Sequence, residues 1–325
     1  MSPDTDPHRA AHPARPADPA GARAALRSAL FPALPLARVR ALQVLVHAFV
    51  ILDVLTFSDD VPAHAGNTGF YTPLALARLL HLPPVTAPLA YTLLGLLLTG
   101  CVAAILGWRP RLAGTVVAIA YWLWMLYSNS YGYIAHDHMA LMVAVAVLPT
   151  VAHPPRPTGR DEAAGAASVT SEAAGWALRC VQIAVVATYA FSVIPKILYS
   201  GSLANWGNSA ILTWASIRRG SPLAHLLVEH APWVFVPAQW AGLALEALSP
   251  VVLFLRGRAL HLAVVLYLGF HLSTLVLLGI HFLPTVICWA AFLPLEKLRL
   301  PRRVGGRSPS LTRRSPTTPR SRPRR

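Results

Sequence analysis

The chain has 325 residues, of which 55% are hydrophobic and only 13% are charged. That charged fraction is about half of the share found in soluble domains, and several apolar runs approach the roughly 20 residues that cross a bilayer. These features exclude a soluble domain and predict an all-α membrane protein, a polytopic helix bundle. The formal net charge of +15 is concentrated near the two ends of the chain.

Both ends of the chain are basic and poor in large apolar side chains. Residues 1–37 and 297–325 are rich in Arg and Pro, and they cannot bury enough apolar surface to offset the entropy of ordering, so we expect both to be disordered. A basic tail can bind nucleic acid or anionic lipid. Beside a membrane helix we favour anionic lipid and expect no nucleic acid partner. Because the N-terminus lacks the features of a cleaved signal peptide, the first membrane helix is expected to act as an uncleaved signal.

The region between these ends, residues 38–296, is predicted to form one transmembrane domain of about eight segments. In chain order the segments are residues 39–57, 87–107, 111–128, 134–152, 173–194, 233–255, 259–279 and 282–295. The last segment is short for a membrane span.

The charges of the connecting loops predict the orientation of these segments. Most Lys and Arg outside the apolar runs fall in the N-terminal arm, "GWRPR", "HPPRPTGRDE", "RGR" and the C-terminal tail. By the positive-inside rule these parts lie on one side, so both termini are predicted to be cytoplasmic in a multi-pass protein of the plasma membrane. The outer connection 195–232 is rich in apolar and aromatic residues, and we expect one or two short amphipathic helices there on the membrane surface.

Ionisable side chains other than arginine gather near the outer ends of the segments. His136, Asp137 and His138 stand at the start of the fourth segment, and Lys196 follows the fifth. His271 lies in the outer half of the seventh segment. Ionisable groups in membrane segments are costly and usually face the bundle interior or a wet cavity. We therefore predict that His138, Lys196 and His271 line one cavity near the outer leaflet.

Glu246 and His136 are two further candidates for this cavity, and each candidate also has a purely structural explanation. Glu246, in the middle of the sixth segment, is expected to form the cavity floor, whereas His136 can equally be an interfacial cap. Lys196 can extend to the lipid headgroups, or Pro195 can break the helix and turn the lysine back into the bundle. Glu246 and His271 lie deeper, so a structural pairing with another buried polar group is the alternative for them.

The residues do not favour a metal site or a disulfide framework. No HxxxH or HExxH spacing is present, and His136 and His138, two residues apart, do not face each other on a helix. Cys101, Cys180 and Cys288 each lie inside an apolar run without a CxxC pair. We predict no metal cofactor.

Four stretches of this chain carry a resemblance to a known family. They are "RVRALQVLVHAFVILDVLTFSDD", "NSYGYIAHDHMALMVAVAVLP", "IPKILYSGSLANWGNSAI" and "GFHLSTLVLLGIHFLPTVICWAAFLP". In order and spacing, over about residues 38–295, they resemble the horizontally transferred transmembrane (HTTM) domain family, which includes the membrane part of vitamin K-dependent gamma-carboxylases.

The resemblance implies a cofactor and roles for particular residues. In the carboxylases a lysine deprotonates a vitamin K hydroquinone, whose reaction with oxygen yields a strong base that acts on a glutamate side chain. Lys196 is similar to that lysine, and His138 and His271 resemble active-site histidines, so these three are the expected catalytic residues. Trp206 looks like the tryptophan that follows the lysine. With Glu246 and His136 it is assigned to binding a quinone or hydroquinone.

Three functions remain open at this stage. The first is a quinol- and oxygen-dependent membrane enzyme with an outward-facing site. It is expected to act on a small molecule or peptide, because the large extracytoplasmic part of the carboxylases has no counterpart here. The second is a non-catalytic scaffold or accessory protein that binds lipid or quinone. A transporter is third, because the segments lack an evident pair of broken helices in matching halves.

Overall fold

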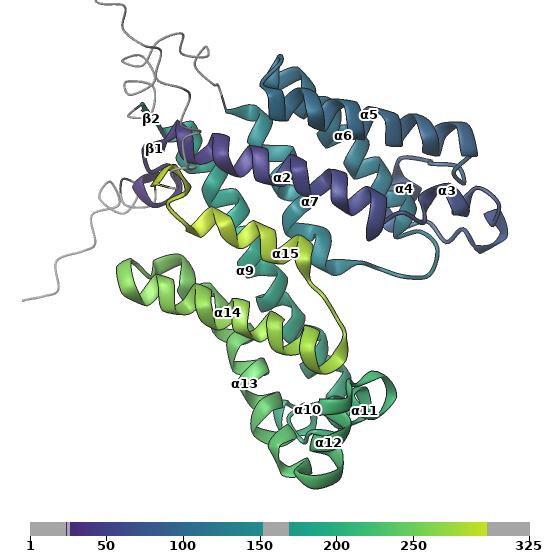
Figure 1. Ribbon diagram of the computed structural model, residues 1–325, viewed down its shortest axis with the longest axis vertical. Coiled ribbons are helices and arrows are strands. Elements are labelled where there is room, and N and C mark those ends of the chain that lie inside the picture. The colour runs from purple at the N-terminus through teal and green to yellow at the C-terminus, as the bar shows by residue number, and fades with distance from the viewer. Residues whose placement is uncertain (1–23, 25–26, 152–168, 298–325) are drawn as a thin grey trace, which may run out of the picture.

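Figure 1 shows a computed structural model of the protein, and the structure describes residues 24, 27–151 and 169–297. Most of the basic arm 1–37, the polar linker 152–168 and nearly all of the tail 297–325 lie outside the described residues, so the expected disorder of the two ends stays a prediction. The described part is helical, as predicted, apart from one very small sheet. In that sheet β1 (Leu34–Pro35) pairs antiparallel with β2 (Thr170–Ser171).

Three long helices and one short one form the first half of the bundle. They are α2 (Leu36–Thr56), α5 (Ala87–Leu106), α6 (Pro110–Ser128) and α7 (Met139–Val147). The tight turn between α5 and α6 has a simple sequence basis. Gly107 ends α5 with φ of 73°, which glycine adopts without strain, and Pro110 occupies the first position of α6, where no N–H is needed.

The fourth predicted segment is not one continuous helix. Two 3-10 helices, His136–His138 and Leu148–Thr150, flank the nine residues of α7. The second of these contains Pro149, which cannot donate to an α-helical ladder. The connection between α2 and α5 contains only short elements, namely α3 (Val61–His64), a 3-10 helix (Thr68–Phe70) and α4 (Ala75–Leu79).

The fifth segment is longer than predicted. Helix α9 runs from Glu172 to Ser200, 29 residues, and passes through Pro195 without ending. The expected helix break at Pro195 is therefore wrong. A proline is tolerated within membrane helices because neighbouring groups satisfy the freed backbone atoms. The helix ends at Gly201 instead, where φ is 78° and the Gly201 N–H bonds the Ile197 carbonyl at 2.9 Å.

Three short helices follow α9, where one or two were predicted within the connection 195–232. They are α10 (Leu203–Trp206), α11 (Ala210–Arg219) and α12 (Pro222–His230). The chain then runs back through a 3-10 turn (Pro232–Val234), α13 (Phe235–Leu248) and a second 3-10 helix (Ser249–Phe254). The remaining elements are α14 (Gly257–Leu278), α15 (Leu283–Cys288) and the 3-10 helices Trp289–Phe292 and Leu295–Lys297.

In the described residues, five stretches are long and apolar enough to cross a membrane. They are Leu36–Thr56, Ala87–Leu106, Glu172–Ser200, Pro232–Phe254 and Gly257–Leu278. Their number makes the chain a multi-pass membrane protein whose apolar helices contact lipid. The predicted third, fourth and eighth segments do not reach the same combination of length and apolarity, and the eighth corresponds to the shorter apolar stretch Leu283–Phe292.

Contacts between distant segments define two ends of the bundle. At one end the Arg38 guanidinium bonds both Glu296 carboxylate oxygens, at 2.6 and 2.7 Å, and Arg40 Nη1 donates to the Ala104 carbonyl at 2.8 Å. The small sheet lies at the same end (Figure 1). At the other end the N–H of Thr72 bonds the carbonyl of Ser130 at 2.8 Å.

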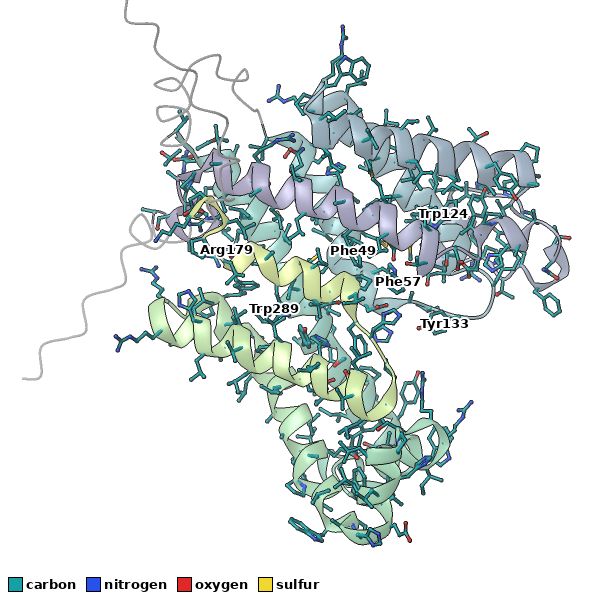
Figure 2. All side chains as sticks on the ribbon, in the orientation of Figure 1. Phe49, Phe57, Trp124, Tyr133, Arg179 and Trp289 are labelled. Atoms are coloured by element: carbon teal, nitrogen blue, oxygen red, sulfur yellow. The ribbon has the colours of Figure 1, made fainter. Side chains whose placement is uncertain are left out.

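The buried apolar core extends over α2, α5, α6, α7, α9 and the segment from α15 to Leu295. Trp124 and Trp289 are almost fully buried in it, whereas Tyr133 is 71% exposed at its edge (Figure 2). Helices α13 and α14, with α10 to α12, form a second part that α9 joins to the first (Figure 1). Many of the apolar side chains of this second part are exposed, which agrees with a surface in contact with lipid.

Candidate functional site

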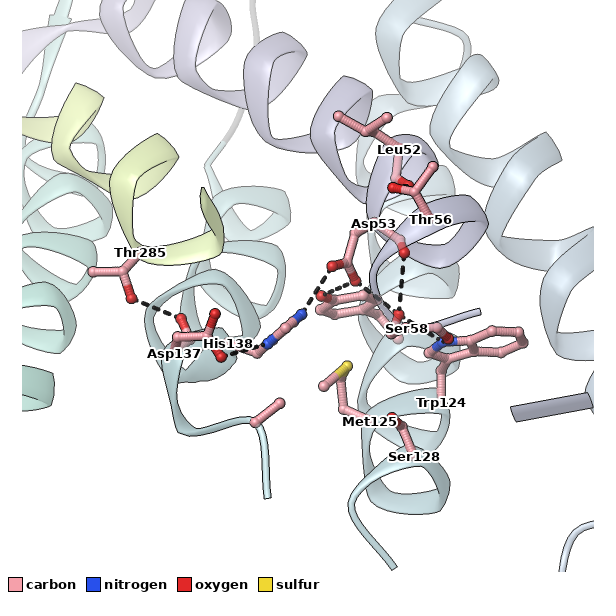
Figure 3. A network of polar contacts seen from close by, with 12 residues as sticks. Leu52, Asp53, Thr56, Ser58, Trp124, Met125, Ser128, Asp137, His138 and Thr285 are labelled. Atoms are coloured by element: carbon pink, nitrogen blue, oxygen red, sulfur yellow. Dashed lines mark hydrogen bonds and ion pairs between the residues drawn. The ribbon is translucent and has the colours of Figure 1, made fainter. Parts of the chain in front are cut away.

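The first polar cluster of the molecule is buried and centres on His138. Its Nε2 lies 2.8 Å from Asp53 Oδ1 and its Nδ1 lies 3.0 Å from Asp137 Oδ1 (Figure 3). The His138 side chain is 4% exposed and that of Asp53 is fully buried. Because both ring nitrogens face carboxylate oxygens, the arrangement is satisfied when both carry a proton.

The other groups around this cluster complete its hydrogen bonds. The hydroxyls of Tyr121 and Ser58 donate to Asp53 Oδ2 at 2.7 and 3.0 Å. Trp124 Nε1 in turn donates to the Ser58 hydroxyl at 3.0 Å, and Figure 3 shows these groups meeting between α2 and α6. Thr285 donates to the Asp137 carbonyl at 2.7 Å. The cluster thus connects α2, α6, α15 and the segment that precedes α7.

A second polar group surrounds Lys196 on α9. The Lys196 ammonium forms an ion pair with Glu246 of α13, and the side chains are 20% and 13% exposed. The Lys196 Nζ also lies 5.6 Å from the centre of the Trp206 ring, within the range of a cation–π contact. Because α9 continues through Pro195, the lysine projects from a regular helix rather than from a broken end.

The position of Trp206 is fixed by the backbone of α10 and by its neighbours. Ser202 caps this helix by accepting from the Asn205 N–H at 3.1 Å, and Gln239 of α13 donates to the Trp206 carbonyl. A Cβ atom added at Gly207 would lie only 2.4 Å from the Trp240 ring. Only glycine allows this close approach, so α10 is held against α13 next to the lysine.

Lys196 and Trp206 border a cavity of about 670 Å³ between α7, α9 and α10. Its walls are mostly apolar. The lining residues are His136, Met139, Val143, Ala184, Ala187, Thr188, Phe191, Ser192, Pro195, Lys196, Tyr199 and Trp206. A volume of this size accommodates a drug-sized or cofactor-sized ring system.

The structure therefore divides the six predicted site residues. It brings His136, Lys196 and Trp206 to one cavity, with Glu246 paired to the lysine. His138 and His271 are not lining residues of that cavity, so the expectation that the three catalytic candidates line it together is wrong. His138 is instead held between two carboxylates, and His271 is buried on α14, where its Nε2 contacts the Tyr189 hydroxyl.

Sequence reasoning missed several residues that hold these groups. Tyr121, Ser58 and Trp124 complete the His138 cluster, and Tyr189 and Trp289 form the surroundings of His271. Each lies far from its partner along the chain, except Ser58, and a tyrosine or tryptophan in an apolar helix gives no separate signal. The described part of the chain holds no group of three or more His, Cys, Asp or Glu side chains placed to hold a metal ion.

The fold and this site define the class of the protein as a multi-pass helical membrane protein with a lysine-containing cavity at one end of its bundle. The HTTM domain family model matches residues 36–296, well over half of the chain, so the chain belongs to the HTTM family, as the resemblance predicted. It is thereby a membrane protein of the carboxylase-related family. No curated protein and no solved structure matches it.

Proposed function

We propose that this protein is a quinol-dependent membrane enzyme in which Lys196 accepts a proton from a ligand in the 670 Å³ cavity. The observation that carries this proposal is the placement of Lys196. It is a largely buried amine at the wall of an apolar cavity, beside a tryptophan ring and backed by a carboxylate. An ionisable group so placed in a membrane protein is, by default, a hypothesis for a functional site.

The volume and the mostly apolar walls of the cavity support a quinone or hydroquinone as its ligand. Its walls are mostly aliphatic or aromatic, and Trp206 offers a ring face for stacking. His136 and Lys196 supply polar atoms at two places on the wall, where they can bind ring oxygens. We therefore assign His136, Trp206 and Lys196 to ligand binding, with Glu246 acting through the lysine.

The ion pair with Glu246 determines when Lys196 can act as a base. As long as the ammonium keeps its proton, it cannot act as a base. The Glu246 carboxylate, already in contact with it, can take that proton and leave a neutral amine and a neutral acid. The amine then accepts a proton from a ligand hydroxyl. When bound, a hydroquinone supplies reducing electrons to this site. His138 acts indirectly, because it does not line the cavity and both of its ring nitrogens are paired with carboxylates.

The proposed topology has eight crossings, with both termini cytoplasmic and the cavity facing outward in the plasma membrane. Two observations support it. The Arg38–Glu296 pair joins the first helix and the last short segment at the same end of the bundle, and the arginines near residue 110 and residue 257 belong to that end by the alternation of the helices. We further propose that the basic tail contacts anionic lipid.

Two measurements test the enzymatic proposal. The first is mass spectrometry of an organic extract of the purified protein, which should contain a quinone. The second is oxygen-dependent quinol oxidation in nanodiscs by the wild type and by Lys196→Met, which keeps the side-chain length without the amine. We expect turnover to fall to background in this variant, and to be unchanged in Lys297→Met, an exposed lysine outside the cavity. Full turnover in Lys196→Met removes the catalytic assignment.

A second candidate function is a non-catalytic scaffold that binds quinone or lipid. The ion pair itself favours it, because a lysine neutralised by Glu246 can simply stabilise the contact between α9 and α13. In that case the extract contains phospholipid or an unreacted quinone, and no quinol oxidation is seen with either protein.

A further inference from the structure

Three buried aromatic side chains form a hydrogen-bonded chain that no part of the proposed proton transfer uses. Trp289 Nε1 lies 2.9 Å from the Tyr189 hydroxyl oxygen, and that hydroxyl contacts His271 Nε2. Exposure is 1% for Trp289, 5% for Tyr189 and 6% for His271. Trp289 lies in the 3-10 helix Trp289–Phe292, Tyr189 in α9 and His271 in α14. The hydrogen-bonded chain therefore joins three separate segments.

The chemistry of the three groups fixes where the protons are. An indole N–H can only donate, so Trp289 donates to the tyrosine oxygen. The Tyr189 hydroxyl has one proton to donate, and the acceptor in contact with it is His271 Nε2. If Nε2 accepts that proton, a neutral imidazole carries its own proton on Nδ1. The chain of contacts therefore selects one tautomer of His271.

The selected Nδ1–H has no partner among the residues that the structure describes. Buried donors in native proteins are nearly always paired, so an unpaired one, on a side chain more than nine-tenths buried, points to an acceptor outside the described residues. The His271 ring lies 5.2 Å from the Phe282 ring, and Phe282 lies 6.3 Å from the ring of His136, which lines the cavity.

The hydrogen-bonded chain of Trp289, Tyr189 and His271 also reaches α9 close to the residues that line the cavity. Tyr189, Ser192 and Lys196 are spaced i, i+3 and i+7, which places them along one side of the helix. Ser192 and Lys196 line the cavity. Tyr189, which does not itself line the cavity, is thus two turns of helix from Lys196 on the same side of α9.

We propose that Tyr189 and Trp289 are positioning residues that hold His271 as the Nδ1–H tautomer, so that this N–H is the donor for an oxygen atom of the molecule bound beside α9. The choice of the tautomer follows from the contacts within the chain. The identity of the ligand, a quinone with ring oxygens, rests on the proposed function.

The tautomer can be read directly by nuclear magnetic resonance. The protein is prepared in nanodiscs with 13C- and 15N-labelled histidine, and the His271 signals are identified by their loss in His271→Gln. We expect the wild type to show the neutral Nδ1–H tautomer at His271. In Tyr189→Phe the accepting contact is gone, and we expect the Nε2–H tautomer or a mixture. Tyr267→Phe is the matched control, because this buried tyrosine of the same cluster donates to the Leu245 carbonyl instead.

Three results decide the inference. A wild-type spectrum with Nε2–H overturns it, as does an unchanged Nδ1–H tautomer in Tyr189→Phe. If Tyr189→Phe does not fold, Trp289→Phe replaces it. This variant keeps the tyrosine but frees its oxygen to accept from Nε2–H, so a mixture of tautomers supports the inference and pure Nδ1–H overturns it.

Adding a short-chain naphthoquinone tests the hydrogen bond to the ligand independently of the choice of tautomer. A change in the Nδ1–H signal of His271 supports the hydrogen bond to the ligand. Quinone that is retained in the extract without such a change overturns that hydrogen bond. If no quinone is retained, the proposed function fails together with the ligand, whereas the wild-type spectrum still decides the role of Tyr189 and Trp289.

Discussion

Two polar clusters in this bundle differ in whether the protein itself satisfies their charged groups. Around His138 each ring nitrogen has a carboxylate partner, and Asp53 accepts from a histidine, a tyrosine and a serine with no exposure to solvent. Around Lys196 one ion pair, still 20% and 13% exposed, borders a cavity of about 670 Å³. The first cluster is complete within the chain, and the second leaves space for another molecule.

The difference shows what an ionisable residue in a membrane bundle does. A charge whose hydrogen bonds are all satisfied by the protein ties helices together, and changing it damages the fold. A charge at a cavity wall keeps part of its bonding capacity for a ligand, so changing it alters binding or reaction more than stability. Four changes, from the largest to the smallest expected effect on stability, test this distinction.

The largest effect is expected for Asp53→Ala in the His138 cluster. The change leaves the His138 ring and the Tyr121 and Ser58 hydroxyls without their buried partner, and breaking such a pair costs about 3–5 kcal/mol. The measurement is thermal or denaturant unfolding in detergent. The exposed neighbour Asp59→Ala should change the free energy of unfolding by less than about 0.5 kcal/mol. A small loss in Asp53→Ala would remove the distinction between the clusters.

An intermediate effect is expected where α10 meets α13 beside the cavity. In Gly207→Ala the new Cβ would overlap the Trp240 ring at 2.4 Å, and such overpacking costs about 1–3 kcal/mol. It also displaces Trp206, so quinone retention should fall. Gly95→Ala is the control, because nothing lies within 4 Å of its added Cβ and the helix α5 gains up to about 1 kcal/mol. Equal melting temperatures for the two variants would contradict the packing argument.

A smaller effect on stability is expected for Glu296, whose ion pair with Arg38 predicts a dependence of stability on pH. Hydrogen bonds from Arg38 hold the pKa of the Glu296 carboxyl below its usual value. The pair therefore stabilises the fold fully above the pKa that this carboxyl has in the unfolded chain, and the contribution is lost as the pH falls through the lower pKa of the folded state. We expect a loss of about 1 kcal/mol or less on acidification, measured by unfolding at several pH values, and a smaller pH dependence in Glu296→Gln.

The smallest effect is expected for the double change Lys196→Met with Glu246→Gln. It removes both charges of the cavity pair and keeps the side-chain volumes, and such replacements of an ion pair are often neutral or stabilising. The melting temperature should stay close to that of the wild type while quinol oxidation is lost. A loss of stability comparable to that of Asp53→Ala would place Lys196 among the structural charges and favour the scaffold function.

Much of the fold follows from the sequence, and its failures have identifiable causes. The long apolar runs gave α2, α5, α6 and α14 within a few residues, because apolar length and a Gly or Pro at the ends determine such helices. The break at Pro195 was wrong because local propensity was overridden by packing. Lys196 has its ion-pair partner 50 residues away, in a helix that holds α9 in place.

The site was predictable only in part, for a related reason. Sequence reasoning named Lys196, Trp206 and His136 as site residues, and all three line one cavity, although the trio expected to share a cavity was His138, Lys196 and His271. It could not assign His138 and His271, because their surroundings depend on partners such as Asp53 and Tyr189, 85 and 82 residues away. Residues at that separation meet only through the packing of whole helices.

The Asp53–His138 pair also has a consequence for the synthesis of the protein. The two residues are 85 positions apart, and ribosomes add about 5–20 residues per second, so the aspartate waits roughly 4–17 s for its histidine. A single carboxylate in a membrane helix costs about 2.5–3.5 kcal/mol at the bilayer centre. Asp53 lies only three residues before the end of α2 (Leu36–Thr56), so until His138 is made its carboxylate is best placed toward the headgroups, and its buried bond to the histidine forms only after the fourth segment is made.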